Sequence, residues 1–202
     1  FRELYEKAWP TRERADRARF FTVQEVLDLQ VLSQLAWFDE IHLAQDVEVS
    51  RLARKGRAYS ESDKAVLRKK ELELFNVTLD AYREASQRGQ IEISTSPFYH
   101  PILPLLIDTD VAVESHSGIR LPRRPFRHRD DAQEQLRRAV ALHERFFGAR
   151  PRGLWPSEGS LSDAVLRMAA EEGFQWTATD EGVLGRTLSI SFHRHSDGTV
   201  AG

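Results

Sequence analysis

Apolar residues recur every three or four positions through the first third of the chain, as on the buried face of a helix. The first run comprises Val26, Leu29, Leu32, Ala36 and then Phe38 or Ile41. It follows Thr22 and Glu25, whose spacing is that of a capping box at a helix start. A second apolar stripe predicts a long helix over residues 62–88, which Gly89 ends. Residues 1–88 are therefore expected to be mainly helical.

The rhythm changes after Gln90, where short β-rich runs alternate with helical ones. Strands are predicted at 91–95, 151–155 and 174–179, with a further candidate at 188–193. Helices are predicted at 131–147 and from Ser160 or Ser162 to Glu172, ended by Gly148 and Gly173. The prolines in 96–101 require a loop there. This alternation predicts an α/β fold with parallel strands over residues 89–202.

The side chains that could take part in catalysis or binding follow the predicted strands. His100, Glu158 and the pair Asp180 and Glu181 each come just beyond a strand end, where parallel α/β barrels assemble their active sites. The predicted strands are too few for a closed barrel, and the chain begins with Phe1 rather than methionine. We therefore expect residues 1–202 to be one partial barrel domain, truncated at both ends.

Composition excludes several classes of protein. Apolar residues make up 41% of the 202 residues and charged residues 30%, as in a soluble globular domain. The net charge of −2 gives no field that favours nucleic acid or an anionic membrane, and the basic runs 120–124 and 127–129 are interpreted as solvated loop. There is no cysteine and no apolar run long enough to cross a bilayer. The compartment stays open, with the cytoplasm as the default expectation.

Glu158 is the strongest catalytic candidate. It stands between Pro156 and Gly159, and Trp155 precedes it. An indole can stack on the apolar face of a sugar while a carboxylate attacks the anomeric carbon. The same glutamate could instead cap the next helix, whose N-terminus favours negative charge. His100 could donate a hydrogen bond to a substrate hydroxyl, or could be an ordinary loop histidine.

The other polar candidates also have two interpretations. Asp180 and Glu181 could bind or act on a sugar, or could cap a helix. His193 and His195 share one face of a possible strand, as metal ligands do, but no third ligand accompanies them. We therefore predict neither a metal nor any other cofactor.

Several segments resemble glycoside hydrolase family 57, in the right order and at the right spacing. They are Gly89–Leu106, Gly153–Ser162, Trp176–Leu184, and the stretch from Leu27–Gln30 through Leu35–Asp39. The resemblance implies an α-amylase, amylopullulanase or α-glucanotransferase type of enzyme, built on an incomplete (β/α)7 barrel with a long helical segment at its N-terminal side. It also implies that Glu158 is the nucleophile of a retaining reaction, and that His100, Trp155, Asp180 and Glu181 shape the sugar site.

The resemblance implies a substrate as well as a missing part. The substrate would be an α-1,4- or α-1,6-linked glucan, and the residues fit hydrolysis and transfer alike. The family's acid/base aspartate lies in a downstream Asp-Gly-Glu type of motif; Asp197-Gly198-Thr199 lacks the glutamate. The remainder of the same polypeptide is expected to supply that residue, so this chain alone is expected to be inactive.

Two other functions fit parts of the pattern. A carbohydrate-binding domain derived from such an enzyme would need Trp155, His100 and Asp180 but not Glu158. A metal-dependent barrel hydrolase is supported by the histidine pair at 193 and 195. Substitution of Glu158 separates the first from an enzyme, and metal analysis tests the second.

Overall fold

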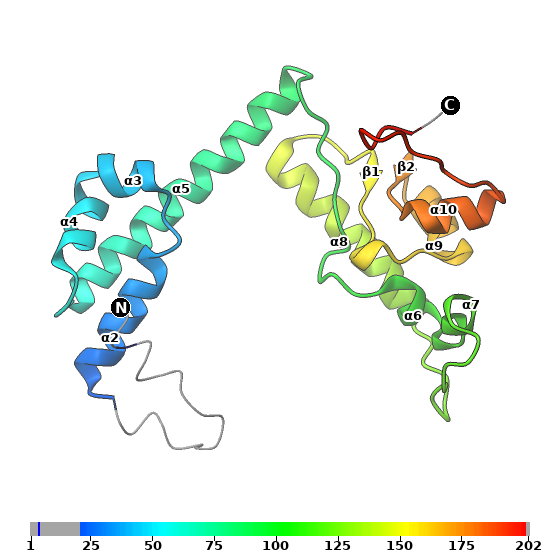
Figure 1. Ribbon diagram of the computed structural model, residues 1–202, viewed down its shortest axis with the longest axis horizontal. Helices are drawn as coiled ribbons and strands as arrows, with labels where there is room; N and C mark the ends of the chain where they lie inside the picture. Colours follow the sequence, from blue (N-terminus) through cyan, green and yellow to red (C-terminus); the bar gives the residue numbers. More distant parts are fainter. Residues whose placement is uncertain (1–3, 5–20, 201–202) are drawn as a thin grey trace. The chain divides into compact units, whose positions relative to one another are not determined.

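The computed structural model describes Leu4 and residues 21–200 (Figure 1). The chain divides into two compact units, Phe1–Asp80 and Ala81–Gly202. The long helix α5, Glu61–Gln87, crosses the boundary between them and closely matches the helix predicted at 62–88. Within the part of the chain that is described, no helix is both long and apolar enough to traverse a bilayer.

The first unit is helical, as predicted. It contains α2 (Val23–Leu35), α3 (Glu40–Gln45), α4 (Val47–Lys55) and the first turns of α5. The capping box at the start of α2 is confirmed, because the side chains of Thr22 and Glu25 each bond the other's backbone N–H. The continuation to Ile41 is wrong. Asp39 accepts a hydrogen bond from the Ile41 N–H and begins α3 instead.

The core of the first unit is apolar and is bordered by two buried carboxylates. Its fully or nearly buried members are Val31, Leu35, Phe38, Val49, Leu52, Tyr59 and Leu67. Asp28 accepts hydrogen bonds from the backbone N–H groups of Ala58 and Tyr59, at 2.9 and 2.8 Å. Although burial raises the pKa of the Asp28 carboxyl, these bonds lower it overall. Asp28 thus joins α2 to the segment that precedes α5.

Asp63 is the second of these carboxylates, with 8% of its side chain exposed. The ammonium of Lys55 holds its pKa well below the usual range, helped by the Ser60 N–H and the Arg51 guanidinium. Its bonds therefore join α4 to the start of α5. Both carboxylates act as structural links within the first unit.

The second unit alternates strands with helices. It contains α6 (Leu103–Ile107), η2 (Thr109–Val111), α7 (Ala112–Ser115), α8 (Arg129–Phe147), β1 (Gly153–Leu154), η3 (Ser157–Gly159), α9 (Asp163–Glu171), β2 (Trp176–Thr177) and α10 (Glu181–Leu188). β1 and β2 are parallel, with Gly153 opposite Trp176. Thr95 also bridges Leu154 in parallel, so β1 lies between Thr95 and β2.

Two helices of this unit lie close to their predicted positions, α6 and α7 were not predicted, and the strands are shorter than expected. α8 and α9 match the predicted helices, and Ser162 rather than Ser160 caps α9 by accepting the Val165 N–H. The strand predicted at 91–95 is reduced to the bridge at Thr95. The strand predicted at 188–193 is wrong, because α10 continues through Leu188 and Ser189 then turns with φ 55°. Among the described residues, helix is far more abundant than strand.

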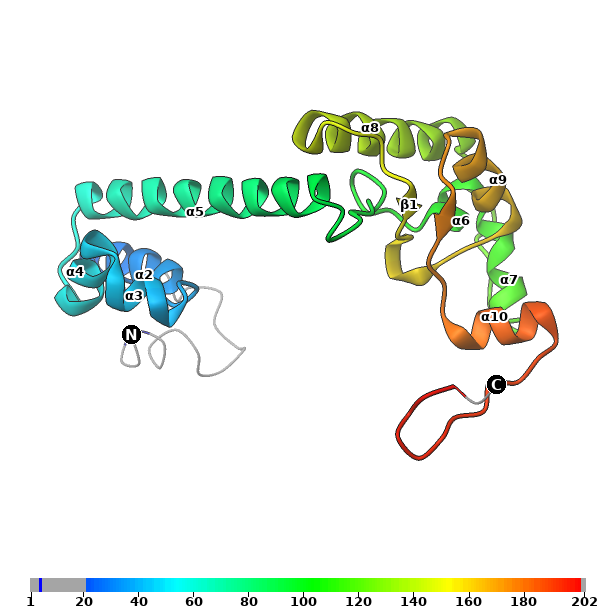
Figure 2. The same cartoon turned by 90° about the horizontal axis from the view of Figure 1, so that it is seen from above.

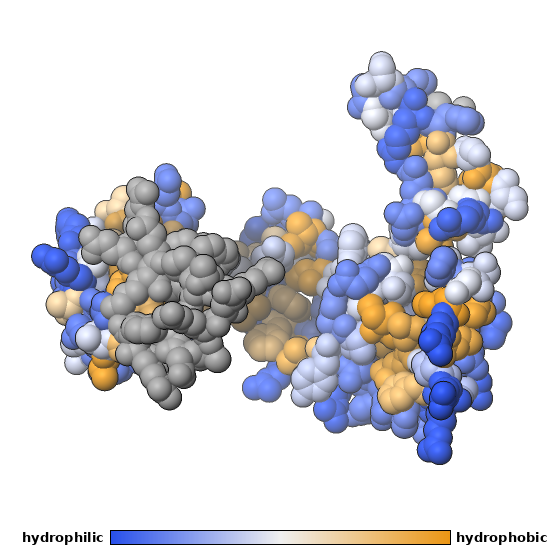
Figure 3. All heavy atoms as spheres, turned by 60° about the horizontal axis from the view of Figure 1, so that its bottom comes forward, coloured by the Kyte–Doolittle hydropathy of each residue, from blue (hydrophilic) through white to orange (hydrophobic). Residues whose placement is uncertain are grey.

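The core of the second unit lies between β1 and the helices α6, α8 and α9, and α8 runs beside β1 in Figure 2. Its buried members are Leu103, Ala132, Leu136, Val140, Leu154, Val165, Met168, Ala169 and Phe174. His143 of α8 closes one end, its ring nitrogens 2.8 Å from the carbonyl oxygen of Ala149 and 3.2 Å from that of Ile93. Figure 3 shows hydrophobic side chains beside strongly hydrophilic ones on the surface of this unit.

The opposite side of β1 carries a tight contact. A Cβ on Gly153 would lie 2.0 Å from the ring of Trp176, so only glycine leaves room for this indole. The indole N–H donates to Glu92 at 2.6 Å, which fixes the ring across β1. Trp176 is nevertheless 40% exposed.

Candidate functional site

Two loops leave neighbouring strands from adjacent backbone positions. The Thr95 N–H donates to the Gly153 carbonyl at 3.1 Å, and the Trp155 N–H donates to the Thr95 carbonyl at 2.8 Å. The loop that carries His100 and the turn that carries Glu158 therefore start side by side. Because parallel strands end at the same edge, both side chains are delivered to that edge.

Glu158 adopts an unusual backbone conformation. It lies in the short turn η3 with φ 53° and ψ 24°, the left-handed region that non-glycine residues rarely occupy. Such a conformation costs about 1–3 kcal/mol and is concentrated at functional sites. Its carboxylate is open to solvent, with 74% of the side chain exposed. A glutamate that served only to cap α9 would need neither feature, and Ser162 already fills that role.

His100 is held in a similar way. Its φ is 57°, and its N–H donates to the Pro97 carbonyl at 2.9 Å. The preceding residues are fixed to α8, because the Tyr99 N–H donates to the side chain of Gln135 at 2.8 Å. The two left-handed residues meet: Nε2 of His100 lies 3.5 Å from Oε1 of Glu158. The structure thus brings together two residues that the sequence singled out separately.

This arrangement suits a carboxylate that reacts with a bound molecule. An imidazole beside a carboxylate can pair with its charge when protonated, or donate to a substrate oxygen when neutral. Trp155, whose N–H is bonded to Thr95, has a residue exposure of 56% and shares the side of the sheet occupied by Gly153. An exposed indole near an exposed carboxylate can stack on a sugar ring.

Asp180 and Glu181 have local structural roles. Asp180 caps α10, accepting the Gly182 N–H at 2.7 Å, and Glu181 pairs with Arg194. Both follow β2, as predicted, and the capping alternative holds for Asp180. Their part in substrate binding stays a prediction.

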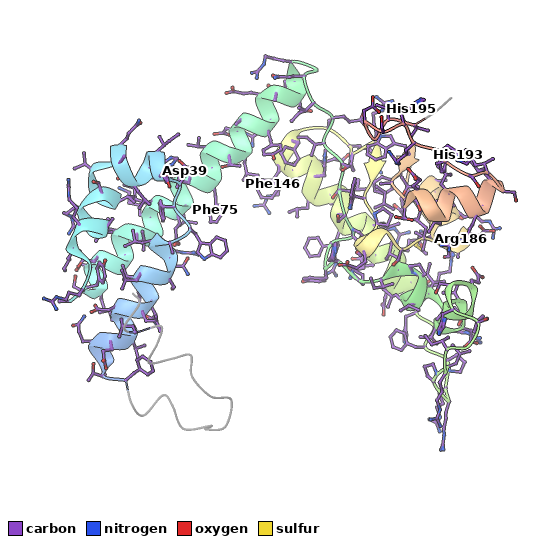
Figure 4. The ribbon with its side chains drawn as sticks, viewed as in Figure 1. Asp39, Phe75, Phe146, Arg186, His193 and His195 are labelled. Carbon is purple, nitrogen blue, oxygen red and sulfur yellow. The ribbon has the colours of Figure 1, made fainter. Side chains whose placement is uncertain are left out.

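His193 and His195 lie on the segment after α10, as Figure 4 shows. The His195 N–H donates to the Thr199 carbonyl in a turn, so this segment is not the strand on which a shared face was expected. Across Leu4 and residues 21–200, no three His, Asp or Glu side chains are grouped as metal ligands. The arrangement of the histidine pair therefore gives the metal-dependent alternative no support.

Sequence reasoning missed one buried polar group in the site. The hydroxyl of Ser157, in a residue only 1% exposed, has no hydrogen-bond partner within the described chain. It lies directly before Glu158, where nothing in the sequence marked serine as unusual. A hollow of about 790 Å³ also lies between α9, β2 and α10, but Glu158, His100 and Trp155 do not line it.

Comparison with known proteins places this geometry in context. An α-amylase, AmyC from Thermotoga maritima, has a similar solved structure, with 18% identity and a TM-score of 0.41 over 88% of this chain and 30% of that one. A GH57-type branching enzyme from the hyperthermophilic archaeon Pyrococcus horikoshii has 17% identity and a TM-score of 0.44 over 92% and 33%. The chain thus spans about a third of the length of these structures.

Curated proteins and family models give the remaining comparisons. No curated protein matches the chain. Residues 19–198, which cover most of both compact units and every candidate site residue, match the model of glycosyl hydrolase family 57. The chain therefore belongs to glycosyl hydrolase family 57.

Proposed function

We propose that the chain is part of the catalytic domain of a retaining enzyme that cleaves or transfers α-glucan chains, with Glu158 as its nucleophile. Membership of the family supports the reaction class. The observation that carries the residue assignment is the exposed, left-handed Glu158 at a strand end, 3.5 Å from His100. The parallel order of Thr95, β1 and β2 is consistent with a segment of an incomplete barrel.

The proposed reaction has two displacements at one carbon. The Glu158 carboxylate attacks the anomeric carbon as the glycosidic bond breaks, and a second carboxyl group protonates the departing oxygen. The same second group then takes a proton from water, or from a sugar hydroxyl, as that oxygen attacks the glycosyl-enzyme and releases Glu158. Water gives hydrolysis, and a sugar hydroxyl gives transfer.

The second carboxyl group is proposed to come from the remainder of the polypeptide. A retaining pair stands roughly 5 Å apart, and the acid needs a raised pKa. Asp197 does not suit this role, because the Thr199 hydroxyl and N–H lower its pKa. Asp180 and Glu181 are engaged with Gly182 and Arg194. The isolated 202-residue chain is therefore expected to lack activity.

The other site residues would bind and orient the sugar. Trp155 stacks on its apolar face, and His100 donates to a hydroxyl or restrains the Glu158 carboxylate between the two displacements. Asp180 and Glu181 would contact the sugar from the end of β2. None of these roles requires a metal or an organic cofactor.

The experiment is Glu158→Gln in the full-length enzyme that contains this chain, assayed on starch, maltooligosaccharides and pullulan. We expect a loss of at least about a thousandfold, because removal of a covalent nucleophile leaves only binding and electrostatic effects. Glu144→Gln, a change of the same chemistry at the end of α8, should keep full activity. Azide should restore turnover to Glu158→Gly, since a small anion can enter the vacated position.

Retention of more than about a tenth of the wild-type rate by Glu158→Gln would reject the nucleophile. Glucan binding by an inactive wild-type enzyme, unchanged in Glu158→Ala, would instead identify a carbohydrate-binding domain. Chromatography of the products separates hydrolysis from transfer and α-1,4 from α-1,6 cleavage.

A further inference from the structure

Residues 110–126, which include α7, form a long connection between α6 and α8, called here the arginine arm. Its two ends are joined at the base. The Thr109 N–H donates to the Phe126 carbonyl at 3.1 Å, and the Phe126 N–H donates to the Thr109 hydroxyl at 3.0 Å. Arg127 adds bonds to Asp108 at 2.9 Å and Asp110 at 2.8 Å. The arm is therefore a closed excursion with a defined base rather than a loose connection.

The tip of the arm carries cations without anions. Arg120, Arg123 and Arg124 are exposed and have no ion pair within the described chain, although Arg127 at the base takes both nearby aspartates. Three arginines of the adjoining α8 are paired instead: Arg129 with Glu171, Arg137 with Glu172 and Arg138 with Glu134. Pro122 and Pro125 restrict the backbone between these cations. The three arginines thus fall within five residues of the chain, and the described residues offer none of them an ion pair.

The arm lies at the same end of the second unit as the candidate site. α8 leads into β1 and lies beside it, so the start of α8 is at the end where β1 delivers Glu158. The His100 loop is bonded to Gln135 in the second turn of α8, and the arm enters α8 at Arg129. Figure 1 shows the segment after α7 projecting from this end. A glucan chain bound at Glu158 could therefore extend toward the arm.

We propose that the arginine arm binds phosphate monoesters carried by the α-glucan substrate, an inference that rests on the proposed function. A guanidinium forms paired hydrogen bonds with phosphate oxygens and stays charged at every physiological pH. A neutral glucan gives such groups nothing to neutralise. The net charge of −2 argues against a general polyanion surface.

The test measures binding by the 202-residue chain, so it does not depend on turnover. Native gels contain amylopectin that carries phosphate, or the same batch after phosphatase treatment. We expect wild type to bind phosphorylated amylopectin at least about fivefold more tightly, since exposed charge-assisted bonds add modestly. The combined variant Arg120→Gln, Arg123→Gln, Arg124→Gln should bind both glucans equally.

The matched control removes the same charge from the first unit, as Arg54→Gln, Arg57→Gln, Lys69→Gln, and should keep the preference. Circular dichroism confirms that both variants are folded. Equal binding of both glucans by wild type, or a preference kept by the arm variant, would overturn the inference. So would a phosphorylated-glucan signal abolished equally by inorganic phosphate and by a DNA duplex, which would show a general anion site.

Binding to neither glucan would also overturn the inference, whereas the catalytic proposal would still be decided by Glu158→Gln in the full-length enzyme. Competition by glucose 6-phosphate, but not by glucose or inorganic phosphate at the same concentration, would support recognition of a phosphate attached to sugar. The two proposals can therefore fail separately.

Discussion

Two carboxylates show how differently the two units use the same chemical group. Asp63 in the first unit is almost buried and accepts bonds from Lys55, Arg51 and Ser60. Glu158 in the second unit is 74% exposed, has a left-handed backbone and faces one histidine at 3.5 Å. Asp63 is satisfied by its own protein, whereas Glu158 keeps its acceptor capacity free. The contrast separates a carboxylate that joins helices from one that is left accessible to a bound molecule.

Gly153→Ala should have the largest effect on stability, because it disturbs β1, the strand that precedes Glu158. The added methyl group would collide with the Trp176 ring, which Glu92 holds in place. We expect a loss of about 3 kcal/mol in the unfolding free energy of the second unit. Urea denaturation with hydrogen exchange resolved by unit measures it, and the protection of the first unit should be unchanged.

A double-variant cycle provides the control. In a Trp176→Ala background, Gly153→Ala should cost less than about 1 kcal/mol, because the colliding ring is gone. An equal cost in both backgrounds would show that the contact is not the cause.

Asp63→Asn should have the next largest effect, confined to the first unit. The amide keeps the size of the carboxylate but loses its charge toward Lys55 and Arg51. We expect a loss of about 2 kcal/mol, as for a broken network around a buried polar group. Thermal unfolding followed by circular dichroism gives the value. Asn at the exposed Asp163 should change stability by less than about 0.5 kcal/mol.

The pH dependence provides an independent check on Asp63. Its pKa in the folded chain is lower than in the unfolded chain, so its bonds stabilise the first unit above the ordinary aspartate pKa of about 4. That contribution is lost as the pH falls from there toward the folded value. The stability of the first unit is compared below pH ~4 in the wild-type chain and in Asp63→Asn. An equal loss in both would contradict the assignment.

Glu158→Gly should have the smallest effect on stability, because Glu158, unlike Asp63, is not expected to stabilise its unit. Glycine adopts positive φ without strain, and this gain slightly exceeds the cost of its extra backbone entropy when unfolded. We expect a change within about 1 kcal/mol, in the stabilising direction. Glu158→Val should be destabilising at the same position, because a branched side chain is poorly tolerated at φ 53°. Differential scanning calorimetry measures the stability of both variants relative to the wild-type chain.

Much of the helical structure could be predicted from the sequence, because helix ends are specified locally. The spacing of Thr22 and Glu25 marked the start of α2, and Gly148 marked the end of α8 with φ 76°. The break between α2 and α3 was missed, since the apolar pattern continues across it while Asp39 caps a new helix. The strands came out too long because pairing, which the sequence pattern does not contain, limits them.

The site was only partly predictable for the same reason. The types of residue at strand ends pointed to His100 and Glu158 one at a time. Their approach depends on the register between Thr95 and β1 and on two left-handed residues, which are properties of the folded backbone. The covering of Gly153 by Trp176 is equally non-local.

The bonds that tie Thr95 to β1 limit how this region can change in evolution. His100 follows Thr95 closely, and Glu158 follows Trp155 closely, so each side chain is joined to a hydrogen-bonded backbone position by a short segment, called here a tether. An insertion or deletion in either tether would turn its side chain away from the other. Length differences between homologous proteins should therefore be absent from both tethers and gather in the arginine arm, because its closed base separates it from the ends of the strands.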